Sequence, residues 1–186
     1  AGAMDWQLAW FRIERPMTNI ESCAEPCTGR YDGGAVHQGL ETTLGWAQGP
    51  WRLDGGATVL AAERRGSTET PALNGTRPTN VPRLVMRAKA AYAVAAVPGL
   101  SLDGGLVHEG RRSVLADRSI ELASWTRLDA GVRYATKVQG VATHWTLAVE
   151  NLTDRRYYKE SPTQYGHVYL FTGTPRTLRL ALQADF

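Results

Sequence analysis

The sequence predicts an all-β fold, an antiparallel transmembrane β-barrel of eight meandering strands. First, apolar and polar residues alternate with a period of two, most clearly where Leu178, Leu180 and Leu182 alternate with Arg179 and Gln183. Second, the segments between these runs are alternately long and short. Third, no stretch approaches the roughly 18 apolar residues that a transmembrane helix needs. A membrane protein with this sequence must therefore cross the bilayer with strands.

Eight segments show this alternation, and each ends at a turn signal or a polar run. The first has apolar side chains on both sides, so its facing is ambiguous, and Pro16 limits its length. Short turns end the second, fourth and sixth segments at residues 48–50, 98–99 and 139–140. In chain order, the predicted strands cover residues 6–14, 36–47, 51–64, 84–97, 100–108, 122–137, 141–154 and 178–186.

The other connections are long and polar, and this asymmetry predicts how the barrel is oriented. Outer-membrane barrels have long extracellular loops and short periplasmic turns, so both termini of an eight-strand meander lie on the periplasmic side. Trp46, Trp51 and Phe186 then gather at the periplasmic boundary, as an aromatic girdle does. The predicted long loops are residues 15–35, 65–83, 109–118 and 155–172, the last with possible strand extensions.

Lipid fixes which face of each strand points outward. A one-residue slip of the last strand would turn Arg179 and Asp185 toward the hydrocarbon. An arginine at the bilayer midplane costs about 2–4 kcal/mol. We therefore expect the leucines of this strand to face lipid and its polar residues to face the lumen.

The carboxyl-terminal residues resemble a known family. The run 149–158, Val-Glu-Asn-Leu-Thr-Asp-Arg-Arg-Tyr-Tyr, is followed by Gly-Thr-Pro-Arg at 173–176 and by an alternating strand that ends in Phe186. This pattern resembles the carboxyl-terminal end of TonB-dependent outer-membrane receptors, most closely the ferric-siderophore branch. Phe186 also resembles the signal by which the barrel-assembly machinery recognises outer-membrane proteins.

Two further motifs, at residues 39–41 and 76–82, extend the resemblance to about residues 35–186. The resemblance implies a barrel of about 22 strands with a plug. On this basis the chain is a carboxyl-terminal wall segment that cannot transport alone. The implied location is the bacterial outer membrane. The implied partners are a ferric siderophore, outer-membrane lipid, the barrel-assembly machinery, and TonB through an absent amino-terminal region.

Composition narrows the remaining possibilities. The net charge is +3, but Lys and Arg are spread among Asp and Glu, so we expect no nucleic-acid partner. Cys23 and Cys27 have no nearby histidine, which favours a short loop disulfide over zinc. Ala1-Gly-Ala-Met4 is typical of an expression scar, and we assign residues 5–186 to the barrel segment.

We expect no catalytic residue, metal site or cofactor, because the four histidines lie on separate predicted elements and no nucleophile or phosphate-loop motif is present. Function then depends on binding. Arginine and aromatic side chains in the loops suit an anionic, partly aromatic chelate. The alternative is that they are solvated loop charges and girdle tyrosines. The candidate ligand-binding residues are Arg64, Arg65, Arg111, Arg112, Tyr165 and Tyr169.

Two other architectures share this periodicity. A stand-alone eight-stranded outer-membrane barrel with a structural or adhesive role would close on itself and pair its charges across a narrow lumen. A soluble barrel of lipocalin type would turn the apolar face inward. Convergence of Leu180, Leu182 and Val132 on a dry centre, with Arg179 and Arg133 outside, would contradict the outer-membrane assignment.

Overall fold

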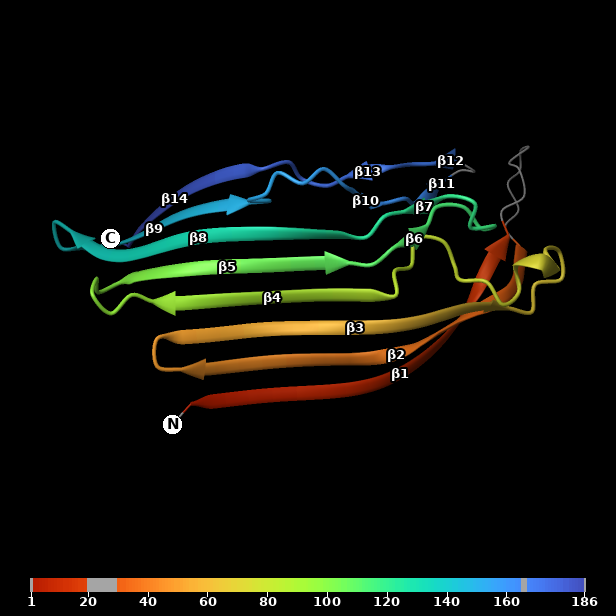
Figure 1. The fold of residues 1–186 in the computed structure, drawn as a ribbon, viewed down its shortest axis with the longest axis horizontal. Helices are drawn as coiled ribbons and strands as arrows, with labels where there is room; N and C mark the ends of the chain where they lie inside the picture. The colour runs from red at the N-terminus through yellow and green to blue at the C-terminus, as the bar shows by residue number, and fades with distance from the viewer. Residues whose placement is uncertain (1, 20–29, 165–166, 186) are drawn as a thin grey trace.

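The computed structural model describes residues 2–19, 30–164 and 167–185. Eight long strands form one antiparallel sheet in which each strand pairs with its neighbours in chain order (Figure 1). This confirms the predicted all-β meander. The strands of the sheet are β1 (Ala3–Asn19), β2 (Arg30–Gln48), β3 (Trp51–Arg65), β4 (Leu84–Ala93), β5 (Leu100–Glu109), β8 (Trp125–Val138), β9 (Val141–Glu150) and β14 (Thr177–Asp185).

The short elements all lie in the long connections. Loop 66–83 contains the 3-10 turn η1 (Pro71–Leu73). Among the described residues, no helix is long and apolar enough to cross a membrane. The remaining short strands are β6 (Arg112–Ser113), β7 (Glu121–Leu122), β10 (Tyr158–Glu160), β11 (Thr163–Gln164), β12 (His167–Val168) and β13 (Phe171–Thr172).

Several strand ends differ from the sequence prediction. β1 continues through Pro16 to Asn19, with a register shift between Pro16 and Thr18. Proline is tolerated here because the register shift interrupts the regular ladder of hydrogen bonds, as at a β-bulge. β8 begins at Trp125 and not at 122, because Leu122 pairs with Arg112 in the separate β6–β7 hairpin. The alternation of apolar and polar residues predicted neither the extension of β1 nor the β6–β7 pairing.

Short turns and both chain ends lie at one end of the sheet, and the long loops lie at the other (Figure 1). The turn before β5 requires glycine: Gly99 has a φ of +83°, and a Cβ on it would lie 2.0 Å from the carbonyl oxygen of Ala135. β1 begins at Ala3, and Met4 pairs with Trp46 in the sheet. The assignment of residues 1–4 to an expression scar stays a prediction.

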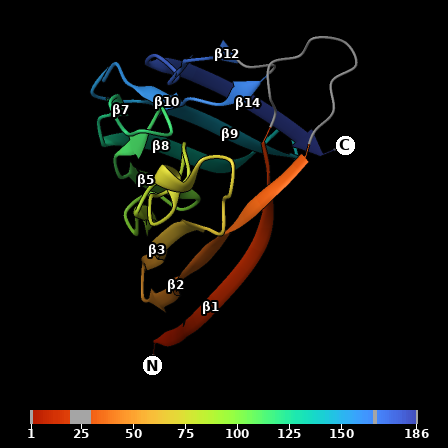
Figure 2. The ribbon, with the colours of Figure 1, turned by 90° about the vertical axis from the view of Figure 1, so that its right-hand side faces the viewer.

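The sheet is an open arc (Figure 2). β1 and β14 are its two edges, and among the described residues they do not pair with each other. The arc therefore has the form of a barrel wall, and the expected alternative of an eight-stranded barrel closed on itself is not the form that this structure takes.

One face of the sheet is apolar along all eight strands, because directly paired residues share a face. Leu178, Leu180 and Leu182 are 68%, 71% and 54% exposed, and Val132 is 36% exposed, so they do not converge on a dry centre. This excludes the lipocalin-type arrangement. From the registers, the face carries Trp6, Leu8 and Trp10; Leu40, Thr42 and Leu44; Leu53, Gly55, Ala57 and Val59; Leu84, Met86, Ala88 and Ala90; Leu102, Gly104 and Leu106; Leu128, Ala130 and Val132; Leu147 and Val149; and Leu178, Leu180 and Leu182.

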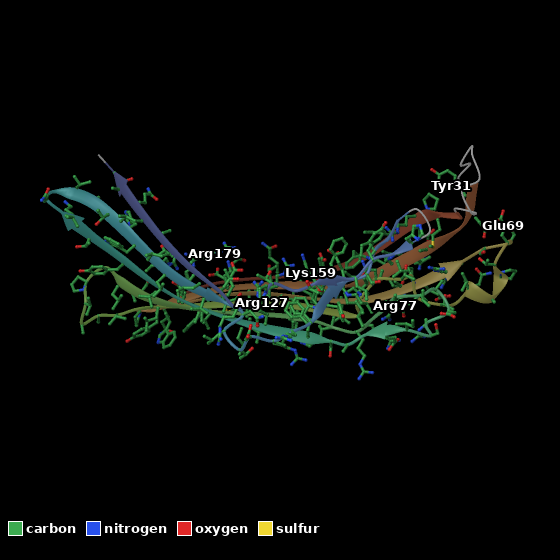
Figure 3. All side chains as sticks on the ribbon, turned by 90° about the horizontal axis from the view of Figure 1, so that it is seen from above. Tyr31, Glu69, Arg77, Arg127, Lys159 and Arg179 are labelled. Atoms are coloured by element: carbon green, nitrogen blue, oxygen red, sulfur yellow. The ribbon has the colours of Figure 1, made fainter. Side chains whose placement is uncertain are left out.

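The opposite face carries the charged residues. Arg179 lies 3.2 Å from Glu150 on the neighbouring strand, and Arg133 pairs with Asp103 on the strand beside it. The two arginine side chains remain 67% and 58% exposed (Arg179 is labelled in Figure 3). These charged side chains pair with residues on neighbouring strands and remain exposed on the concave side of the wall. A wide lumen requires this arrangement, whereas a narrow one would pair them across the centre.

Aromatic side chains border the apolar face at the short-turn end. Trp51 pairs with Tyr92, and their ring centroids are 4.6 Å apart. Tyr134 on β8 pairs with Trp145 on β9, across the short turn at residues 139–140. Trp46 lies on the same face, paired with Leu53. Trp46 and Trp51, the positions expected for a girdle, thus both lie at the short-turn end of the apolar face, while Phe186 lies outside the described residues.

Candidate ligand-binding site at the long-loop end

Most of the buried residues lie where loops 66–83, 110–124 and 151–176 meet, beyond the ends of β5, β8 and β9 (Figure 1). Val114, Leu122 and Trp125 are between 4% and 7% exposed. Most buried polar residues are here too, namely Glu109, Arg112, Ser113, Asn151 and Ser161. Because the wall is a single layer, these loops supply most of the compact packing among the described residues, although Ala35 and Val36 on β2 are buried as well.

Asn80 connects the three loops. Its side-chain Oδ1 accepts hydrogen bonds from Arg112 Nη1 at 3.1 Å and from the backbone N–H of Ser161 at 3.0 Å. Its own backbone N–H donates to the carbonyl oxygen of Ser113 at 2.8 Å. We call this set of contacts the Asn80 junction.

The guanidinium of Arg112 is committed to this junction. Arg112 also forms an ion pair with Glu109, and both side chains are buried, at 8% and 12% exposure. A buried ion pair needs every polar group satisfied, since desolvation of the two charges is costly. The contacts of Arg112 therefore favour a structural role, and its predicted role as a ligand residue stays untested.

Asn151 organises the base of loop 151–176. It is fully buried and has a φ of +53°. Its Nδ2 donates to the carbonyl oxygens of Arg155 and Thr174, both at 2.9 Å, and its Oδ1 accepts the N–H of Arg155. β9 ends at Glu150 and not at 154 because this turn begins there. The asparagine in the run 149–158 is thus explained by structure, without any ligand.

Tyr157 and Gly173 explain two more residues of the same pattern. The ring of Tyr157 stacks on Trp125, with centroids 4.2 Å apart and planes 24° apart. A Cβ on residue 173 would lie 2.0 Å from Tyr157 Cζ, so only glycine leaves room for the ring. The backbone N–H of Gly173 donates to the Tyr157 carbonyl. The aromatic stack fixes loop 151–176 against β8.

Four arginines line one cavity of about 330 Å³ between loops 66–83 and 110–124, which we call the arginine cavity. Its only described acidic residue is Glu121, which lies 3.4 Å from Arg118. No described carboxylate is within ion-pair distance of the other three arginines. The lining residues are Arg77, Arg83, Arg111, Ser113, Arg118 and Glu121.

The electrostatics of this cavity favour an anion. Burial lowers the pKa of the Arg77 guanidinium, and the charges of Arg83 and Arg118 lower that pKa further, against a smaller opposing effect of Glu121. The Nε of Arg77 is buried and has no hydrogen-bond partner among the described residues. An anionic group in the cavity would relieve the repulsion between these like charges. Arg77 is labelled in Figure 3.

Of the predicted ligand residues that the structure describes, only Arg111 lines the arginine cavity. Arg64 and Arg65 line a different cavity, of about 200 Å³, together with Asp32, and Arg65 also pairs with Glu63 at 3.2 Å. Tyr169 is 44% exposed. The other predicted positions, Tyr165 and the disulfide candidates Cys23 and Cys27, lie outside the described residues.

Sequence reasoning missed Arg77, Arg83 and Arg118. They are single arginines, whereas the predicted ligand arginines are adjacent pairs. Two adjacent residues of an extended segment point to opposite sides, so such a pair cannot place both side chains in one cavity. Arg77 lies in the motif 76–82, which was the one available signal. Among the described residues, no cluster of His, Cys, Asp and Glu could hold a metal ion.

Comparison with known proteins agrees with this architecture. Residues 2–152 match the family described as "TonB dependent receptor-like, beta-barrel". The chain is 31% identical over 182 residues to the ferrichrome receptor FcuA of Yersinia enterocolitica, covering 96% of this chain and 23% of that protein.

Two solved structures show the same fold. The ferric preacinetobactin receptor BauA of Acinetobacter baumannii superimposes with a TM-score of 0.83 and 25% identity, over 98% of this chain and 27% of that one. The ferric yersiniabactin uptake receptor FyuA of Yersinia pestis has a TM-score of 0.78 and 20% identity, over 98% of this chain and 28% of that one.

The chain thus spans about a quarter of the length of these relatives. Its open arc corresponds to part of their barrel, which explains why β1 and β14 remain unpaired edges. The family consists of non-enzymatic transport proteins of the bacterial outer membrane. With residues 2–152 of its 186 residues in the match and an eight-strand wall of the same form, the chain belongs to the TonB-dependent receptor-like β-barrel family.

Proposed function

We propose that this chain forms part of the barrel wall and the extracellular loops of a TonB-dependent receptor for a ferric siderophore. The relatives FcuA and BauA are named as receptors for ferrichrome and for ferric preacinetobactin. In this proposal the remaining strands and a plug belong to the rest of the receptor. TonB acts through the amino-terminal region, and the barrel-assembly machinery recognises the end at Phe186.

The arginine cavity is the single observation that carries the ligand chemistry. Three arginines with no carboxylate partner among the described residues, in a cavity at the long-loop end, suit a ligand with an excess of negative charge. A ferric tris-catecholate is such a ligand, because three dianionic groups surround one Fe³⁺. A ferric trihydroxamate is neutral, because three monoanionic groups balance the metal. Arg111 belongs to this site, and Arg64, Arg65, Tyr165 and Tyr169 are further candidates around it.

The test compares these two probes on the complete receptor that contains this chain. Replacing Arg77 and Arg111 together by glutamine should weaken binding of a ferric tris-catecholate by about tenfold or more, because charge-assisted hydrogen bonds are lost. Binding would be measured by isothermal titration in detergent, and uptake by radioactive iron in cells without other receptors.

Arg52→Gln is the matched control. Arg52 is an exposed arginine at the short-turn end and pairs with Asp54 at 3.0 Å, so its loss should leave binding unchanged. If the double variant binds the tris-catecholate as the wild type does, the arginine cavity is not the ligand site. If the wild type binds neither probe and takes up no iron, the siderophore function itself is wrong.

A further inference from the structure

We infer that Asn80 is a positioning residue that holds the three long loops together as one body, so that occupation of the arginine cavity is transmitted to loop 151–176. The residue belongs to loop 66–83, and its partners Arg112 and Ser161 belong to the other two loops. The contacts span up to 81 residues of sequence.

A single oxygen atom joins the second and third loops. Oδ1 of Asn80 accepts from Arg112 Nη1 and from the Ser161 N–H, at 3.1 and 3.0 Å. Both donors are buried, since Arg112 is 8% exposed and Ser161 is 0% exposed. Water therefore has little access to replace the asparagine, and losing the acceptor would leave two buried donors unsatisfied.

The backbone around Asn80 is suited to this role. Asn80 has a φ of +60°, a conformation that asparagine tolerates better than most residues with a side chain. Pro78 and Pro82 flank it in the motif 76–82 and restrict the segment further. This motif marks a preorganised turn, and the structure assigns its asparagine to the contact between loops.

The junction lies next to the arginine cavity. Arg111 and Ser113 line that cavity, and Arg112 between them is held by Asn80 and Glu109. The Ser113 carbonyl accepts the Asn80 N–H at 2.8 Å. A shift of β6 on ligand binding would therefore move Asn80 and, through Oδ1, the backbone at Ser161. This consequence rests on the proposed function, whereas the junction itself does not.

The first test needs no ligand. In the complete receptor, Asn80→Gly keeps the positive φ but removes Oδ1, so exchange of the Ser161 amide hydrogen should become about tenfold faster or more. Asn80→Asp retains an acceptor oxygen and should restore slow exchange. If Asn80→Gly lowers the yield of folded receptor, Asn80→Ser, whose shorter side chain cannot span both donors, replaces it.

Asn74 provides the control within the same loop. Its Oδ1 accepts the Ser67 N–H at 3.0 Å, and its Nδ2 donates to the Ser67 carbonyl, so its contacts stay within loop 66–83. Asn74→Ala should speed exchange at Ser67 and leave Ser161 unchanged. If Ser161 exchanges equally slowly in the wild type and in Asn80→Gly, the junction does not hold loop 151–176 and the inference is wrong.

The second test adds a ferric tris-catecholate as the probe. In the wild type, binding should slow amide exchange in residues 157–164 as well as in loop 110–124. In Asn80→Gly, protection of loop 110–124 should remain while that of 157–164 is lost. Equal protection of 157–164 in both proteins would overturn the coupling. Absence of binding to the wild type would contradict the proposed function, and the ligand-free test would still decide the junction.

Discussion

The barrel wall and the long-loop end of this chain are stabilised in different ways. Wall strands pair with their neighbours in sequence, and one of their two faces carries exposed leucines, tryptophans and alanines with no second layer against them. The loop end is held by buried polar contacts between distant segments, with the Asn80 junction reaching across 81 residues. In the wall the membrane takes the place of a core, whereas the loops must build a core of their own.

This difference predicts where substitutions are tolerated. A wall position requires only the right polarity for its face, because lipid adapts to many apolar shapes. A junction residue requires specific donors and acceptors, because each unsatisfied buried group is costly. Three comparisons of variants test this contrast, from the largest expected effect to the smallest.

Arg112→Ala should have the largest effect on stability. It removes the partner of the buried Glu109 carboxylate and one donor to Asn80, and breaking a buried pair costs about 3–5 kcal/mol. The measurement is the free energy of unfolding of the receptor in detergent. The neighbouring exposed Arg111 is the control, since Arg111→Ala should change stability by less than about 0.5 kcal/mol. Equal effects would remove the contrast between buried and exposed loop arginines.

Leu180→Arg and Ala181→Arg compare the two faces at adjacent positions of β14. Leu180 pairs with Leu147 on the apolar face, and Ala181 pairs with Thr146 on the charged face. At the bilayer midplane an outward arginine costs about 2–4 kcal/mol, while a lumenal one costs little. Folding into phospholipid vesicles would measure both. If Ala181→Arg proved the more harmful change, the assignment of the lipid face would be reversed.

Arg179→Ala should have the smallest effect. The Arg179 side chain is 67% exposed, and its contact with Glu150 on the open wall is a surface ion pair. Such pairs contribute less than about 1 kcal/mol, and salt weakens them further. We expect the change in unfolding free energy to shrink as salt concentration rises. A loss as large as that of Arg112→Ala would show that this part of the wall is buried against another structure.

The sequence was most informative in the wall and least informative in the loops. The short turns expected at residues 48–50 and 139–140, the long-loop asymmetry and the facing of the last strand match the structure. The fourth strand ends at Ala93 and not at 97, so its connection to β5 covers residues 94–99. The extension of β1 past Pro16 and the β6–β7 hairpin did not follow from periodicity, because Arg112–Ser113 and Glu121–Leu122 are too short to alternate. Among the ligand candidates within the described residues, only Arg111 lies in the arginine cavity.

Sequence alone determined which face meets lipid in every strand but the first, because a residue's face depends only on its parity along the strand. The facing of β1, apolar on both sides in the sequence, was decided by its register on β2. The lengths of the connections in the sequence likewise determined which end of the sheet carries the short turns. Only the tertiary structure decided that Arg77, Arg83, Arg111 and Arg118 share a cavity and that Asn80 joins three loops. Those contacts depend on how segments far apart in the chain approach one another, and no periodic pattern within a single segment encodes that approach.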